Sequence, residues 1–442
     1  MTGEPAGIAT ETTTTGGLRT QARWFIIGIP LFLAWAFANM DKIGIAIVAT
    51  DQTFLSNFGL VGHRAEIGLL LTTFTFAYAV GNFSWGFAID RLGARKVTII
   101  SALLWTAMMV LAAITSAFDI LLVSRIILGL AEGALWGVSA KLVGNWFHVG
   151  ERARAMGFPA YGQAGGPAIA SALIVAMIYV GGWRFSFLVL AALDLIVIVP
   201  IFLFLVRDTP EQSSAVNPAE LAYIQDGRRV ARQPSAPSSQ EWIATLRDPR
   251  FWFVTIGFTV TPFAFFALTT WVPSYLVEVR HFSKAAMGAW LSAGYLIAIG
   301  EVILATALAD YLRSPGLIGG IALALAAVNL LIGIQAPNPD VAAILITTGQ
   351  GGCLTASMMA ITLLQRYFKP AVLGRLSGTT TAIASIGGGI SPTLLGWLLD
   401  VGKGNYTPSF SIVAVFLIIG AIVFVACLGV RPKPDELQVA TI

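Results

Sequence analysis

The chain has 442 residues, of which 56% are hydrophobic and only 11% are charged. A soluble domain carries roughly a quarter charged residues, so this composition excludes an ordinary water-soluble protein. The formal net charge is +4, and the basic residues gather beside apolar runs, so they do not indicate a nucleic-acid partner.

Apolar runs long enough to cross a membrane recur along almost the whole chain. A spanning helix needs about 20 mainly apolar residues at ~1.5 Å rise each. We predict an all-α membrane protein with twelve transmembrane helices, near residues 24–49, 66–89, 97–116, 120–146, 157–180, 183–206, 251–277, 286–309, 316–335, 341–364, 375–399 and 409–429.

The basic residues predict the orientation, because Lys and Arg accumulate in cytoplasmic loops. Most of the 27 Lys and Arg residues fall on the side of the N-terminus. Only Lys42, Arg125 and Lys141 lie inside predicted helices. Both termini are therefore predicted to be cytoplasmic, as in a multi-pass protein of the inner membrane.

Residues 1–22 form a polar leader that we expect to be disordered, and no cleavable signal peptide is apparent because the first apolar run is too long. The two cysteines, Cys353 and Cys427, both fall in predicted spans. They indicate neither a disulfide framework nor a metal site.

The first span carries an acid and a base side by side, Asp41 and Lys42. An ionised group at the centre of a membrane helix costs ~2.5–3.5 kcal/mol on insertion scales, so such residues usually face the protein interior and mark a pathway. Adjacent helical residues point about 100° apart, so these two side chains should diverge while flanking the same region. The alternative is a static ion pair with the fourth span.

The fourth span carries Arg125 and Glu132. Seven residues make almost two turns, which places both side chains on one face about 10 Å apart. Gly129 and Gly133 on the same stretch permit close approach of a neighbouring helix. The alternative is again a static buried ion pair.

Further charges in the first half are harder to assign. Lys141 lies near the end of its span and can extend toward water, so we interpret it as structural or related to gating. Asp194 lies in the middle of the sixth span, and the sequence gives it no function. The three histidines fall at or near helix ends, so carboxylates are the better proton carriers.

A polar stretch at 207–250 separates two halves, at 23–206 and 251–430, and a tail follows at 431–442. Asp90 and Asp310 align at an offset of 220 residues, and Pro167 and Pro392 at an offset of 225. These near-equal offsets indicate a duplicated six-helix unit, as in transporters that rock two bundles around a midplane site. The alternative is chance recurrence at helix ends.

In the second half, Glu301 lies nine residues before Asp310, about 13 Å deeper in the eighth span. It is a possible second proton site. Aromatic residues could also line an apolar cavity suited to an aromatic acid: Trp136, Phe265, Phe266 and Trp271.

The stretch "GFAIDRLGARK" resembles the loop signature of the major facilitator superfamily. The matching residues are Gly86, Asp90, Arg91, Gly93, Arg95 and Lys96. The resemblance implies two pseudo-symmetric six-helix bundles with cytoplasmic termini. It also implies a gating role for this loop, in which the charge cluster binds a neighbouring helix end in one state and releases it in another.

Further stretches resemble the anion:cation symporter branch, which includes bacterial transporters of galactonate and hexuronates and animal sialin. They include "MDKIGIAIVA", "SRIILGLAEGA", "RDTPEQ" and "WVPSYL". The resemblance implies proton coupling at Asp41 and Glu132, and substrate contact at Lys42, with Arg125 in an interior network. The branch usually has Arg where this chain has Lys42, which removes a bidentate carboxylate contact.

The resemblance also makes Tyr78 a substrate contact, and Gln163 is a plausible further partner. An anion would neutralise Lys42 and Arg125, so both are predicted to bind it.

We predict a monomeric, proton-coupled symporter of a small organic anion, with protons as coupling ions and no cofactor. The alternatives are an antiporter, a carrier of neutral or cationic solutes, or an aromatic-acid transporter. An enzyme is not expected, because the sequence has no nucleophile and base pair, metal cluster or phosphate loop.

Overall fold

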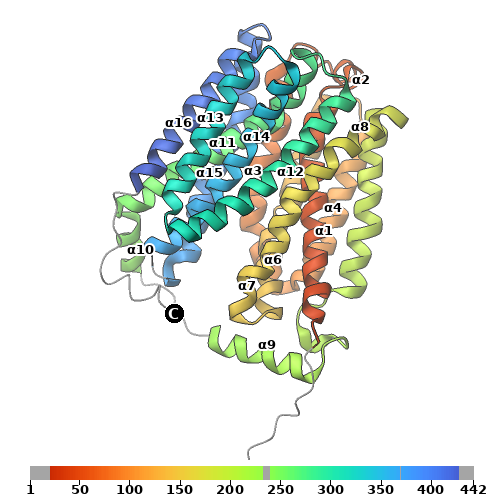
Figure 1. Ribbon diagram of the computed structural model, residues 1–442. Coiled ribbons are helices and arrows are strands. Elements are labelled where there is room, and N and C mark those ends of the chain that lie inside the picture. Colours follow the sequence, from red (N-terminus) through yellow and green to blue (C-terminus); the bar gives the residue numbers. More distant parts are fainter. Residues whose placement is uncertain (1–19, 232–238, 369, 428–442) are drawn as a thin grey trace, which may run out of the picture.

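The computed structural model describes residues 20–231, 239–368 and 370–427, and this part of the chain is helical apart from its connections. Ten helices in it are long and apolar enough to cross a membrane. They stand side by side in one elongated body, with a short helix lying across one end (Figure 1).

The helices before the polar stretch form the N-terminal half. They are η1 (Trp24–Gly28), α1 (Ile29–Val48), α2 (Gln52–Asn57), α3 (Arg64–Leu92), α4 (Ala94–Ile114), α5 (Phe118–Glu132), α6 (Ala134–Trp146), η2 (Val149–Glu151), α7 (Arg152–Ala155), α8 (Gly157–Leu193), η3 (Asp194–Ile198) and η4 (Ile201–Leu205). Of these, η1, η3 and η4 are π-helical.

The polar stretch itself holds three short helices, η5 (Pro210–Gln212), α9 (Pro218–Ala231) and α10 (Ser239–Leu246). The C-terminal half follows. Its helices are α11 (Pro249–Glu278), α12 (Lys284–Leu312), α13 (Pro315–Gln335), α14 (Pro339–Tyr367), α15 (Pro370–Val401) and α16 (Tyr406–Ala426).

The ten long helices differ from the predicted twelve spans at two places. The predicted span at 120–146 is divided into α5 and α6 at Gly133, so neither piece is long enough alone. The predicted spans at 157–180 and 183–206 lie within the stretch Val149–Leu205. Two helices meet there at Gly182, whose φ of 77° and ψ of 179° are not helical and suit glycine. The count of twelve stays a prediction.

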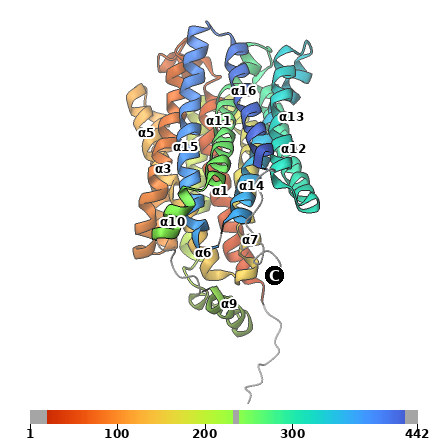
Figure 2. The same cartoon turned by 90° about the vertical axis from the view of Figure 1, so that its left-hand side faces the viewer.

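The two halves meet along three helix pairs, α3 with α15, α8 with α12, and α1 with α11. Figure 2 shows α1, α11 and α15 running together through the centre of the molecule. The aspartates aligned in the sequence occupy matching positions, because Asp90 and Asp310 each lie two residues before the end of their helix.

We call the end of the molecule that carries α9 the linker side and the opposite end the far side. The two halves are joined by polar contacts on the far side. Arg64 pairs with Glu278 at 2.9 Å, and Lys284 pairs with Asp51. The carboxylate of Asp400 accepts hydrogen bonds from the first amides of α3, those of Arg64 and Ala65, at 2.9 and 2.8 Å. The N-terminus of α3, in the N-terminal half, is thus capped by Asp400 of the C-terminal half.

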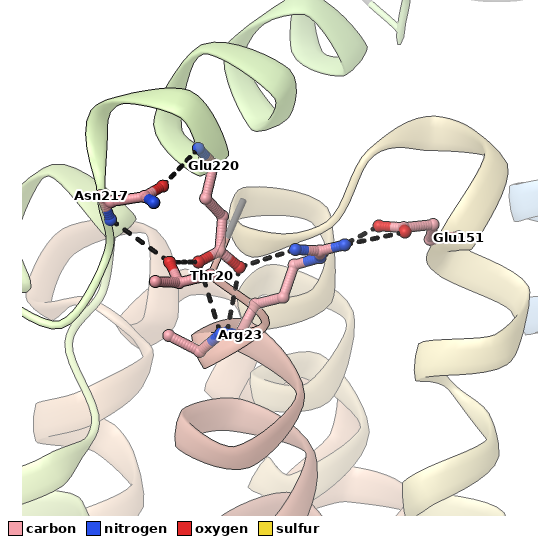
Figure 3. Close-up of polar contacts among 6 residues, drawn as sticks. Thr20, Arg23, Glu151, Asn217 and Glu220 are labelled. Atoms are coloured by element: carbon pink, nitrogen blue, oxygen red, sulfur yellow. Dashed lines mark hydrogen bonds and ion pairs between the residues drawn. The ribbon is translucent and has the colours of Figure 1, made fainter. Parts of the chain in front are cut away.

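On the linker side, α9 is bound to the N-terminal half through one buried guanidinium (Figure 3). Arg23 pairs with Glu220 of α9 at 2.6 Å and with Glu151 at 2.9 Å. Glu220 is fully buried and also accepts from the Thr20 hydroxyl. Because breaking a buried ion pair leaves an uncompensated charge, α9 should move together with this half. The predicted tails at 1–22 and 431–442 lie almost entirely outside the described residues.

Candidate functional site

Asp41 and Lys42 leave α1 in different directions, as the helical geometry predicts. Both are nearly buried, with 1% and 9% of their surface exposed. Asp41 lies inside the N-terminal half, where it interacts electrostatically with Asp194 of η3 and with Arg125 and Glu132 of α5. The Lys42 side chain instead points toward α3, so Asp41 and Lys42 lie in different surroundings.

The Lys42 ammonium is surrounded by aromatic faces. Its Nζ atom lies 4.8 Å from the ring centre of Tyr78 and 5.5 Å from that of Phe74. Among the described residues, no carboxylate lies within 4 Å of it. Cation–π contact is attractive but does not neutralise the charge. Lys42 is therefore a nearly buried cation without an ion-pair partner in the described part of the chain. The acid that interacts with it electrostatically, Glu132, lies beyond 4 Å.

Two predicted substrate residues, Lys42 and Tyr78, are thus brought together. The Tyr78 side chain also contacts Trp136 of α6, which packs against Trp35 with ring centres 4.5 Å apart. Trp136 is 38% exposed and lies beside Tyr78. Trp271 is not available to a bound molecule, because it is 1% exposed and donates to the Pro392 carbonyl.

Gln163 is not brought to Lys42. Its neighbour Gly162 packs against the Phe32 carbonyl of α1, whereas Gly44, two residues beyond Lys42, packs against Ile174. Lys42 therefore lies about nine residues, or ~14 Å, further along these parallel helices than Gln163. A contact of both side chains with one small molecule would need an extended molecule or another conformation.

Arg125 and Glu132 lie on one buried face of α5, with exposures of 1% and 0%. The Arg125 guanidinium packs over Phe187, 5.2 Å from the ring centre, and approaches the sulfur of Met109 at 3.8 Å. Neither Glu132 oxygen has a hydrogen-bond partner among the described residues. Arg125 interacts electrostatically with Asp41 and Glu132, and Glu132 also interacts with Lys42.

Glycines allow α5 to approach α3 closely. A Cβ atom at Gly129 would lie 2.2 Å from the Phe74 carbonyl oxygen, and one at Gly133 would lie 2.7 Å from that of Tyr78. Only glycine fits both places without moving the helices. This contact sets the position of Glu132 relative to Tyr78 and hence to Lys42.

Asp194, to which the sequence assigns no function, belongs to the same buried group. It is fully buried at the start of η3, and its carboxyl meets that of Asp41 from α1. The sequence signal is only an acid in the middle of an apolar span. Its partner lies 153 residues away, and finding it requires the packing of η3 against α1.

The loop signature is bound within the N-terminal half in this conformation. Asp90 pairs with Lys141 of α6 at 2.9 Å, which gives Lys141 a partner on the linker side. The Arg95 side chain donates to the Phe202 and Leu203 carbonyls at the end of η4, and its amide donates to Asp208. No contact with the C-terminal half is found for Asp90 among the described residues, so its predicted gating role stays a prediction.

Glu301 lies half-buried on α12 against α14. A Cβ atom at Gly351 would fall only 1.8 Å from its Oε2 atom, so this glycine makes room for the carboxylate. Within the described part of the chain, no ion pair involves Glu301. Its predicted role as a second proton site remains open to experiment.

Comparison with known proteins adds to this geometry. The sequence model of the Major Facilitator Superfamily matches residues 31–392. The chain is 27% identical over 435 residues to a probable sulfoacetate transporter of Cupriavidus necator, covering 95% of this chain and 97% of that protein. It is 26% identical over 428 residues to a hexuronate transporter of Bacillus subtilis, covering 92% and 96%.

Among solved structures, a bacterial homolog of the human lysosomal transporter Spinster aligns with a TM-score of 0.76. The alignment covers 94% of this chain and 99% of that one at 17% identity, so it concerns the fold alone. That structure is described as inward-facing and unoccupied.

Proposed function

The chain belongs to the Major Facilitator Superfamily, and we propose from this premise that it carries a small organic anion together with protons. The family match confirms the resemblance drawn from the loop signature, and the protein is a multi-pass membrane transporter, not an enzyme. The similarity to a probable sulfoacetate transporter and to a hexuronate transporter supports an acidic substrate, a sugar acid or a similar carboxylate. The cytoplasmic membrane is the proposed location.

The observation that carries the proposal is the state of Lys42. Lys42 is 9% exposed, and its ammonium packs over the faces of Tyr78 and Phe74. Among the described residues, Glu132 interacts with it only from beyond ion-pair distance, so its charge is incompletely compensated. An anion bound there would complete its charge balance, and Trp136 would supply an apolar wall. A cationic substrate would meet repulsion at the same place, which disfavours that alternative.

Proton coupling is assigned to Asp41 and Glu132. Both are buried, and no hydrogen-bond partner in the described part of the chain fixes either carboxyl group in one charge state. Arrival of an anion near Lys42 makes the local field more negative and so favours proton binding at the acids. Crossing then occurs with proton and anion both bound, by alternating opening of the two sides.

The test uses purified protein in liposomes with sulfoacetate, a hexuronate and galactonate as probes. An inward proton gradient should drive accumulation of at least one of them and acidify the interior. Lys42→Gln should raise the half-saturation concentration tenfold or more, since a charge-assisted contact contributes about 1.5–3 kcal/mol. The exposed Lys403→Gln is the matched control.

Glu132→Gln should abolish uphill uptake and spare exchange of labelled against unlabelled substrate. Full accumulation by this variant would remove Glu132 from the coupling mechanism. Alkalinisation in place of acidification would favour an antiporter. Unchanged affinity in Lys42→Gln would remove the proposed anion site.

A further inference from the structure

Two carboxyl groups from distant parts of the chain meet inside the N-terminal half. Asp41 of α1 is 1% exposed and Asp194 of η3 is fully buried. Packing of η3 against α1 brings the two carboxyl groups close enough to interact directly. None of their four oxygens accepts a hydrogen bond from another group among the described residues. The indole of Trp105 lies beside Asp194, but its N–H is also left without an acceptor in hydrogen-bonding geometry.

The charges around this contact do not balance when every group is ionised. The buried acids are Asp41, Glu132 and Asp194, and the buried bases are Lys42 and Arg125. None of the five forms an ion pair within 4 Å in the described part of the chain. Full ionisation would leave one net negative charge in an apolar interior, which is costly.

The contact between Asp41 and Asp194 determines which groups bind the proton that removes this net negative charge. Two carboxylates in contact repel strongly, so they do not both ionise, and one proton between them converts the repulsion into an O–H···O hydrogen bond. With that proton bound, the group of five has no net charge. Glu132 has no comparable carboxyl neighbour in hydrogen-bonding contact.

We propose that Asp41 and Asp194 form a carboxylic acid and carboxylate pair that shares one proton, which makes Asp194 a further proton-binding residue of this protein. The shared proton rests on the structure alone. Its role in coupling rests on the proposed function.

The backbone at Asp194 supports a functional reading. The residue opens the π-helical turn η3, whose hydrogen bond runs from the Val199 amide to the Asp194 carbonyl. Such turns are rare, and they occur frequently at functional sites. This turn packs against both α1 and α4. A change in the charge of Asp194 therefore alters the electrostatic field at α1, the helix that carries Lys42.

The proton balance gives the pair a place in the transport cycle. A second proton adds to the remaining carboxylate and yields two neutral acids, so the group of five then carries one positive charge. One bound monoanion at Lys42 compensates it. Release of the anion and of this proton restores the neutral resting state, which predicts one proton for each monoanion through this pair.

The first experiment measures the pair without transport. Infrared absorption of protonated carboxyl groups is followed against pH in the purified, substrate-free full chain. We compare wild type, Asp41→Asn, Asp194→Asn, the double variant, and Asp119→Asn as a control with an exposed carboxylate. In Asp194→Asn the amide donates to Asp41 and stabilises its carboxylate, so the Asp41 proton should be lost at a pH at least one unit lower.

Because the proton is shared, each single variant should lack the same absorption as the double variant at pH values above the lowered transition of the remaining acid and below the transition of wild type. Asp119→Asn should titrate like wild type. If the absorption lost in Asp41→Asn and the absorption lost in Asp194→Asn add up to the loss in the double variant, the two residues are independent acids and the proposal is overturned. An unchanged titration in Asp194→Asn would overturn it equally. If Asp194→Asn fails to fold, Asp41→Asn provides the same test. In that variant the carboxyl absorption of Asp194 should change at a different pH from the absorption of the pair in wild type, and an unchanged pH would overturn the proposal.

The second experiment separates this inference from the proposed function. If wild type takes up the probes and Glu132→Gln abolishes accumulation, while Asp194→Asn leaves the pH profile of uptake unchanged, the coupling role of Asp194 fails and the symport proposal stands. If the infrared data show a shared proton but no probe is accumulated by a proton gradient, the pair stands and the symport proposal fails.

Discussion

The contact between Asp51 and Lys284 on the far side depends on the charge of a single carboxylate. Burial opposes ionisation of Asp51, but hydrogen bonds from Lys284 and from the side chain and amide of Thr53 outweigh it, so the pKa of Asp51 lies below its usual value. The ionised form therefore stabilises this conformation at pH values above the ordinary pKa of Asp. That contribution is lost as the pH falls through the lowered pKa.

We predict that Asp51→Asn shifts the protein toward opening on the far side. A partly exposed ion pair contributes up to about 1 kcal/mol, so the expected shift in population is up to roughly fivefold. Distances between spin labels at Ser56 and Ala285 would report it. Acidification should widen the distance distribution in wild type and not in the variant. The control Asp119→Asn should match wild type, and an unchanged distribution in Asp51→Asn would contradict the prediction.

Single residues also show where the sequence is informative. The divergence of Asp41 and Lys42 and the common face of Arg125 and Glu132 follow from helical periodicity, so both were predictable. The meeting of Asp41 with Asp194 was not, because it depends on which helices pack together. The pairing of Asp90 with Lys141 depends in the same way on tertiary contacts.

At the level of elements, the approach of α5 to α3 depends on glycine. Gly129→Val would place side-chain atoms against the Phe74 carbonyl, where even a Cβ atom comes within 2.2 Å. We predict a loss of about 1–3 kcal/mol of stability from this overpacking, together with weaker substrate binding because Lys42 and Tyr78 lose their alignment. Thermal unfolding of the purified protein and half-saturation concentrations for uptake would measure the two effects.

Gly144→Ala is the matched control, because no neighbouring atom lies within 4 Å of the added Cβ. Helix propensity favours alanine over glycine, so its midpoint of unfolding should stay the same or rise slightly. Equal midpoints for Gly129→Val and wild type would show that the two helices separate without cost, and would remove this contact as the determinant of the site.

The helices were more predictable than their interruptions. Apolar runs located the long helices within a few residues, because a membrane core demands that length. The break at Gly182 coincides with the predicted boundary between the spans at 157–180 and 183–206. The division at Gly133 left no comparable signal, since glycine is frequent throughout the chain, with 45 residues. The helices inside the polar stretch depend on contacts such as Arg23 with Glu220, which link positions 197 residues apart.

For the whole molecule, the polar contacts that join the two halves gather on the far side. They include Asp51 with Lys284, Arg64 with Glu278, and Asp400 with the start of α3. The linker helix α9 is held by contacts with the N-terminal half, which include Arg23 with Glu220 and Arg228 with the Asn145 carbonyl. Rocking of one half against the other would break the far-side contacts while leaving α9 in place.

A disulfide across the two halves tests whether such rocking is required. The hydroxyls of Thr72 on α3 and Thr393 on α15 lie 2.8 Å apart. Cysteines at both positions should therefore form a disulfide readily. We predict that oxidation of Thr72→Cys/Thr393→Cys abolishes uptake and that reduction restores it, because the far side cannot open while the bond is intact.

The matched control links two helices of one half. Thr255 on α11 and Thr380 on α15 are 3.1 Å apart, and both belong to the C-terminal half. Oxidised Thr255→Cys/Thr380→Cys should keep its uptake, since helices of a rigid half do not need to separate. Loss of uptake in both pairs would point to motion inside a half. Retained uptake in the oxidised Thr72→Cys/Thr393→Cys pair would rule out alternating opening of the two sides, because the substrate would then cross while the far side is held closed.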